Sequence, residues 1–104
     1  MYKRVLKQGA AVRPGSGGRE GPPRWIQNIK VVFKEALFDR ELGIPPHTVA
    51  EMLEVDLARL YAWADPESGD VIPLDKFIKF GRISGDARPI AAVCRMLNGR
   101  FVPL

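Results

Sequence analysis

Side chains that could perform catalysis are scarce in this chain. It contains one histidine, His47, and one cysteine, Cys94, and no glycine-rich loop followed by Lys-Ser or Lys-Thr that would cradle a phosphate. The acids Asp65, Glu67 and Asp70 lie in one stretch, but they lack the Asp-x-Asp-x-Asp spacing and terminal glutamate of a calcium loop. We therefore expect no enzyme activity, no metal site and no cofactor.

The stretch VAEMLEVDLARLYAW at residues 49–63 has the spacing of a surface that binds a macromolecule. Two short helices are expected, over about 48–54 and 57–64, joined by a turn of three or four residues. Five apolar side chains point inward, and small Ala50 lies where the helices cross; the five are Val49, Leu53, Val55, Leu60 and Trp63. This spacing is typical of a helix–turn–helix, whose second helix enters a DNA groove.

The string AEMLEVDLARLYAW resembles the motif of lambda-repressor-like phage regulators, whose usual form is close to AELLGVSxxxLYRW. The following ADPESGDVIPLDKFIKFGRISGD is similar to phage regulatory proteins of CII type, in which a tryptophan and a proline precede an IPL helix start. The resemblance covers about residues 30–99. It implies a transcriptional regulator that binds double-stranded DNA, with Leu57, Ala58, Tyr61 and Ala62 as the outward positions of the second helix.

Three departures from the family pattern bear on DNA binding. Glu54 stands at the turn position where the family usually has glycine, which predicts a strained turn. Asp56 replaces the usual serine at the helix start, where it can cap the helix but brings a negative charge near phosphate. The outward residues Leu57, Ala58 and Ala62 form no bidentate hydrogen bonds to bases and can at best contact thymine methyl groups.

The charge is distributed unevenly along the chain, whose net charge is +4. Residues 47–70 contain one cation, Arg59, among six acids. Because phosphate contacts supply most non-specific affinity, DNA binding requires further cations from elsewhere. Candidates are the basic N-terminal residues Lys3, Arg4, Lys7 and Arg13, and, in the last two helices, Lys76, Lys79, Arg82 and Arg88. A flexible basic arm can wrap DNA or enter its minor groove.

One alternative to a DNA-binding protein stays open, and pairing of two chains is a separate prediction. The acidic surface of the helix–turn–helix would suit a basic protein partner, with Leu57, Ala58 and Ala62 at the centre of the contact. A homodimer is also expected, through the fifth helix and the apolar tail residues Phe101, Val102 and Leu104, because regulators of this fold commonly pair to read two half-sites.

The apolar periodicity predicts an all-α bundle of about five short helices over residues 24–104, preceded by a flexible basic arm over residues 1–23. Gly43 is expected to stop the first helix, Thr48 and Glu51 to form a capping box, Asp86 to cap the fifth helix and Gly99 to end it. The predicted core consists of Trp25, Ile29, Phe33, Leu37, Val49, Leu53, Leu60, Trp63, Phe77, Ile90 and Leu97. Leu74, Phe77 and Ile78 outline the fourth helix.

Composition also predicts the cellular compartment. A single cysteine excludes an internal disulfide and suits the reducing cytoplasm. No apolar run approaches the roughly 18 residues that a membrane span needs, and the N-terminus lacks the apolar core of a secretion signal. We therefore expect a cytoplasmic protein with no membrane contact.

Overall fold

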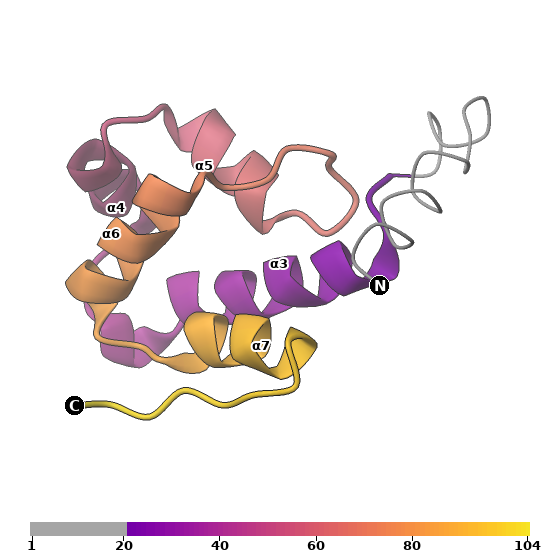
Figure 1. The fold of residues 1–104 in the computed structure, drawn as a ribbon. Coiled ribbons are helices and arrows are strands. Elements are labelled where there is room, and N and C mark those ends of the chain that lie inside the picture. The colour runs from indigo at the N-terminus through magenta and orange to yellow at the C-terminus, as the bar shows by residue number, and fades with distance from the viewer. Residues whose placement is uncertain (1–20) are drawn as a thin grey trace.

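Helices make up the regular secondary structure of the described chain. The computed structural model describes residues 21–104, which form five α-helices and one turn of 3₁₀ helix, with no strand in that range (Figure 1). In order, these are α3 (Arg24–Leu37), η1 (Arg40–Leu42), α4 (Pro46–Leu53), α5 (Leu57–Ala64), α6 (Leu74–Ser84) and α7 (Arg88–Met96). The predicted all-α bundle of about five short helices is confirmed. Most of the predicted basic arm, with Lys3, Arg4 and Lys7, lies outside the described residues.

Helix α3 runs through the middle of the fold and contacts both α5 and α7 (Figure 1). Its second half follows the predicted apolar stripe and buries Phe33, Ala36 and Leu37. The predicted burial of Trp25 is wrong, because this side chain is 55% exposed. The core on α3 begins only at Phe33, so the first turn of the helix projects beyond it.

Gly43 ends η1 rather than α3. The helix α3 stops at Leu37, and the extended Asp39 then accepts a hydrogen bond from the Glu41 amide on its side-chain oxygen, at 2.8 Å. This local bond competes with helix continuation and starts the 3₁₀ turn. Gly43 follows with a φ of 71°, the left-handed conformation that glycine adopts without strain. The prediction that Gly43 stops the first helix is therefore wrong.

Helix α4 begins two residues before the predicted capping box. Pro45 is extended at the N-cap, and Pro46 takes the first helical position. Proline suits that position because its φ is already helical and its missing N–H would have had no partner. Thr48 therefore lies within the first turn, where its amide donates to the Pro45 carbonyl at 3.0 Å. The capping box of Thr48 and Glu51 is wrong.

Helices α6 and α7 are separated by a left-handed glycine. Gly85 has a φ of 68° and ends α6. Ala87 rather than Asp86 is the N-cap of α7, although the Asp86 carboxylate accepts a hydrogen bond from the Arg88 amide at 2.9 Å. At its other end α7 stops at Met96, and Asn98, with a φ of 62°, turns the chain away before Gly99.

The core joins residues of α3, α4, α5 and α6. Its buried members are Phe33, Ala36, Leu37, Val49, Ala50, Leu53, Leu60, Trp63, Ala64 and Phe80. The rings of Phe33 and Phe80 meet edge to face, with 4.9 Å between centroids. Six predicted core residues belong to this cluster, and Phe77 is buried outside it; Ile29 and Ile90 are half-buried. Leu97 is 77% exposed, because the helix has already ended, so its predicted burial is wrong.

The buried face of α6 differs from the predicted one. Phe80 is fully buried, although the sequence pattern did not assign it to the core. Leu74 and Ile78, which outlined the predicted apolar face, are 71% and 52% exposed. The helix is thus rotated relative to the expectation, so that Phe77 and Phe80 point inward.

Candidate functional site

Helices α4 and α5 pack against each other across a turn of three residues, Glu54 to Asp56. Glu54 adopts a φ of 62° and a ψ of 44°, the left-handed conformation that favours glycine. The chain reverses because the Glu54 amide donates to the Glu51 carbonyl and the Val55 amide to the Ala50 carbonyl, each at 3.0 Å. The backbone of Glu54 is therefore strained, as predicted. This conformation costs about 1 kcal/mol or more in a residue other than glycine.

One face of α5 is buried and the opposite face is open. Leu60, Trp63 and Ala64 lie in the core, which leaves Ala58 and Ala62 on the outward side of the helix. Ala58 and Arg59 are exposed, and Ala62 is half-buried. The small side chains of the two alanines form a low ridge along which another molecule can approach the helix closely. The alternation of buried and exposed positions follows the predicted pattern.

An aromatic pair borders the alanine ridge on one side. Tyr61 on α5 stacks on Phe38, the residue that follows α3, with 6.0 Å between ring centroids and 20° between ring planes. Both side chains are about half exposed, at 43% and 50%, and Leu57 one turn earlier is 36% exposed. Phe38 was not among the predicted site residues, because only the packing of α3 against α5 brings it to Tyr61.

A hollow of ≈ 520 Å³ borders the ridge on the other side, and it holds groups of both charges. Arg59 of α5 and Lys76 of α6 line it together, over a floor that includes Trp63. Three acids of α4 and the turn line the same hollow, namely Glu51, Glu54 and Asp56. The structure thus brings one predicted cation of α6, Lys76, to the predicted DNA-contacting helix.

Asp56 occupies the N-cap of α5, yet its side chain makes no capping hydrogen bond. The predicted cap by this carboxylate is therefore wrong. Asp56 is exposed and lines the hollow instead, so its negative charge faces solvent on the side of Arg59. An anion at the start of a helix still interacts favourably with the helix dipole. Asp56 can therefore stabilise α5 without a capping hydrogen bond.

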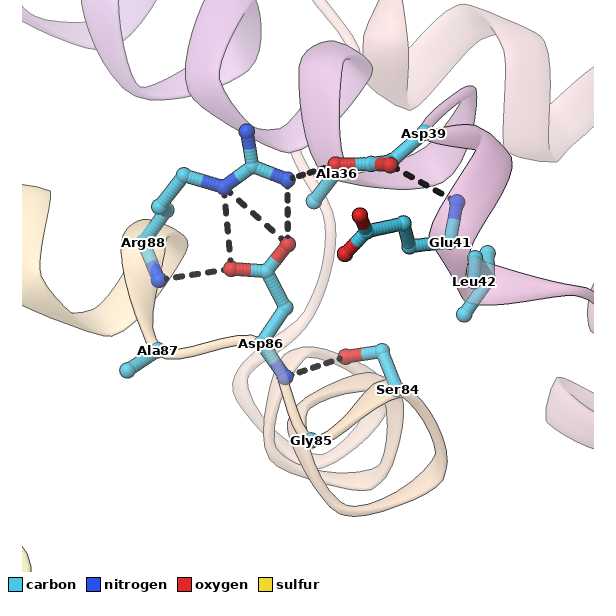
Figure 2. Close-up of a pocket in the computed structure, with 9 residues that line it drawn as sticks. All are labelled: Ala36, Asp39, Glu41, Leu42, Ser84, Gly85, Asp86, Ala87 and Arg88. Carbon is cyan, nitrogen blue, oxygen red and sulfur yellow. Dashed lines mark hydrogen bonds and ion pairs between the residues drawn. The ribbon is translucent and has the colours of Figure 1, made fainter.

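Arg88, another predicted source of positive charge, is held in ion pairs (Figure 2). Its Nη2 lies 2.7 Å from Oδ2 of Asp39 and 2.5 Å from Oδ2 of Asp86. The hydrogen bonds from Arg88 lower the pKa of Asp86; the Glu41 amide and then Arg88 lower the pKa of Asp39. These ion pairs connect the start of η1 to the corner between α6 and α7. The positive charge of Arg88 is compensated there by Asp39 and Asp86.

Lys30 fixes the loop that connects α5 to α6. Although charged residues are rarely buried, the Lys30 side chain of α3 is only 3% exposed. Its Nζ donates to the carbonyl of Ser68 at 2.7 Å and to the carbonyl of Asp70. Burial lowers the pKa of Lys30 below its ordinary value, and the negative charges of Asp65 and Asp70 oppose that shift. Lys30 therefore serves the loop rather than an external ligand.

The net positive charge of the chain belongs to its first twenty residues. Of 16 lysines and arginines, residues 1–20 contain five, and of 12 aspartates and glutamates they contain one. Residues 21–104 therefore hold eleven groups of each sign and are neutral overall. The described residues consequently offer no net positive charge to attract phosphates.

Comparison of the chain with protein-family models, with curated proteins and with solved structures gave no match. Across residues 21–104, no helix is both long and apolar enough to cross a membrane. In the same range, no group of three or more His, Cys, Asp or Glu side chains is arranged to hold a metal ion. The candidate site thus rests on the geometry of α5 and its two borders.

Proposed function

We propose that this protein is a DNA-binding transcriptional regulator of phage or prophage type, and that α5 lies in the major groove. The observation that carries the proposal is the exposed ridge of Ala58 and Ala62 on a helix whose opposite face is locked in the core. Such a helix is rigidly positioned, and its small side chains permit close approach to base edges and thymine methyl groups.

Two described cations support contacts to the phosphates beside the groove. Arg59 and Lys76 line one hollow next to the ridge, so both can reach the same stretch of DNA backbone. The remaining cations would come from Lys3, Arg4 and Lys7 of the basic arm. Because phosphate contacts carry no sequence information, this arrangement favours affinity over base-specific hydrogen bonding. Pairing of two chains through α7 and the tail stays a prediction.

Glutamate substitutions on the ridge test the proposal directly. Ala58→Glu and Ala62→Glu each place an anion against the groove, and each should weaken binding of the full chain to a mixed-sequence duplex roughly ten-fold or more. Asn28→Glu adds the same charge at an exposed position of α3, outside α5 and outside the α7 and tail residues of the predicted dimer contact, and serves as the control. Fluorescence anisotropy measures the affinities, and circular dichroism verifies that each variant is folded.

Equal DNA affinity in the ridge variants and the parent would show that α5 does not enter the groove. A weakening as large in Asn28→Glu as in Ala58→Glu would show that only the total charge matters. In either case the helix–turn–helix would act as a scaffold, and DNA recognition through α5 would be abandoned.

A protein-interaction module is the second candidate, favoured by the stacked pair of Phe38 and Tyr61. Half-exposed aromatic side chains are enriched at the centres of protein interfaces. The segment 47–70, which contains Tyr61, carries six acids and one cation, so it suits a basic partner. Peptides selected against the chain from a random library should be rich in lysine and arginine and should lose binding to a Tyr61→Ser variant. Selected peptides that bind this variant unchanged would contradict this candidate.

A further inference from the structure

A second hollow, distant in sequence from α5, lies at the corner between α6 and α7. It has a volume of ≈ 430 Å³, and its walls include Phe77 and Ile78 of α6 and Ile90 of α7. The C-terminal segment runs back past α7 and adds Phe101 and Pro103 as a third wall (Figure 1). Cavities of this size with mostly apolar walls are typical of small-molecule sites. We call it the corner groove.

A glycine at a helical position forms part of the wall of the corner groove. Gly81 belongs to α6, where a glycine costs roughly 1 kcal/mol of stability relative to alanine. A Cβ atom built at Gly81 would meet no heavy atom within 4 Å, so the position opens on empty space. A larger side chain there would fill the groove without a clash against the backbone.

The corner groove has one uncompensated charge at its edge. Arg82 lines it and is exposed, and no carboxylate among residues 21–104 forms an ion pair with this guanidinium. Asp86 is the other charged residue of the wall, but its carboxylate is engaged by Arg88 at 2.5 Å. The groove thus combines an apolar interior with a single positive charge at its rim.

We propose that the corner groove binds an apolar monocarboxylate, such as a medium-chain fatty acid. The alkyl chain lies between Phe77, Ile90 and Phe101, and the carboxylate accepts hydrogen bonds from the guanidinium of Arg82. Arginine matches this ligand because its planar guanidinium can donate two parallel hydrogen bonds to one carboxylate. None of the lining residues belongs to α4 or α5, so the groove is separate from the helix proposed to enter DNA.

Titration of the full chain with decanoate, below the concentration at which decanoate forms micelles, tests the proposal. Isothermal calorimetry should give saturable binding of one decanoate per chain, and the amide resonances of Ile90 and Phe101 should shift with the same saturation. Arg82→Gln removes the charge and should weaken decanoate binding about ten-fold, as expected for the loss of a charge-assisted pair. Decanol, which has the same chain without the carboxylate, should bind Arg82→Gln and the parent equally.

Two substitutions at Gly81 separate occupation of the groove from a change in the stability of α6. Gly81→Leu fills the groove and should abolish decanoate binding, while Gly81→Ala, which also improves helix propensity, should retain it. Failure of the parent to bind decanoate saturably would overturn the proposal. So would full binding by Gly81→Leu, or unchanged decanoate affinity in Arg82→Gln. Circular dichroism of each variant confirms that a loss of binding does not reflect unfolding.

Discussion

At the scale of single residues, Glu54 carries the conformational cost of the turn between α4 and α5. A side chain with a Cβ atom is strained at a φ of 62°, and glycine would adopt the same conformation freely. The residue also contributes one of three negative charges to the hollow beside Arg59. Glu54 therefore affects both the strain of the turn and the charge of the hollow. Different substitutions of this residue can change the two effects separately.

Glu54→Gly should raise the free energy of unfolding by about 1 kcal/mol, because it relieves the left-handed strain. Glu54→Gln keeps the Cβ atom and removes only the charge, so its stability should stay within about 0.5 kcal/mol of the parent. Urea denaturation measures both. If the proposed function holds, both variants also bind DNA more tightly, since each removes an anion near the phosphates. A Glu54→Gly protein less stable than the parent would show that the turn is not strained.

Lys30 is the residue at which stability should depend on alkaline pH. Its pKa in the folded protein lies below 10.5, the value for an unburied lysine, so between these two values the unfolded state binds more protons. Stability contributed by Lys30 must then rise as the pH increases through that window. Lys30→Met has no such titration, so the stability gap between parent and variant should widen from neutral pH toward 10.5.

At neutral pH, Lys30→Met should lower the free energy of unfolding by about 1–3 kcal/mol, because the carbonyls of Ser68 and Asp70 lose a charged donor. Lys34→Met removes an exposed lysine from the same helix and should change stability by less than about 0.5 kcal/mol. Thermal unfolding of the three proteins across the pH range tests both statements. A gap that narrows with rising pH would contradict the burial of the Lys30 ammonium.

At the scale of elements, α5 is held by one buried face whose central residue is Leu60. Its side chain is fully buried among residues of α3, α4 and α6. Leu60→Ala should cost about 2–5 kcal/mol, as for other buried leucines that leave a cavity. Leu57→Ala on the same helix, where the side chain is 36% exposed, should cost less than about 1 kcal/mol. Similar losses in both variants, measured by urea denaturation, would mean that the inward face of α5 is assigned wrongly.

The helices differ in how well their sequences predicted them. In α5 the apolar and small residues alternate clearly. The sequence therefore predicts Leu60 and Trp63 inward and Ala58 and Tyr61 outward, as the structure has them. In α6 apolar residues occur on two overlapping faces, and the pattern favoured Leu74 and Ile78 over Phe80. The face that is buried is the one that packs on the core, where Phe80 meets the ring of Phe33 on another helix, and such a contact cannot be read from the segment alone.

The borders of the candidate site were less predictable than its centre. Phe38 reaches Tyr61 because α3 ends at Leu37, and that end depends on the local hydrogen bond of Asp39. Lys76 lines the same hollow as Arg59 because the loop held by Lys30 leads into α6, which packs against α4. Phe38 and Lys76 reach the site through packing between segments that are far apart in the sequence. The apolar periodicity of a single helix does not predict such packing.

At the scale of the whole molecule, the described helices are neutral and the excess positive charge lies in residues 1–20. DNA affinity under the proposed function must therefore depend mainly on that arm, with Arg59 and Lys76 as the local contribution of the folded domain. Each cation that neutralises a phosphate contributes about 0.9 to the slope of log affinity against log salt concentration. The number of cations in residues 1–20 therefore predicts how steeply the affinity for DNA falls as the salt concentration rises.

The salt dependence of duplex binding by the full chain tests the proposed function most directly. Affinity for a mixed-sequence duplex should fall steeply with salt, and the triple substitution Lys3→Ala, Arg4→Ala and Lys7→Ala should flatten the slope by up to about three units. The triple variant should weaken binding to all sequences alike, because under the proposed function these residues contact phosphate rather than bases. A parent slope near zero, or no binding at low salt, would contradict DNA binding by this protein.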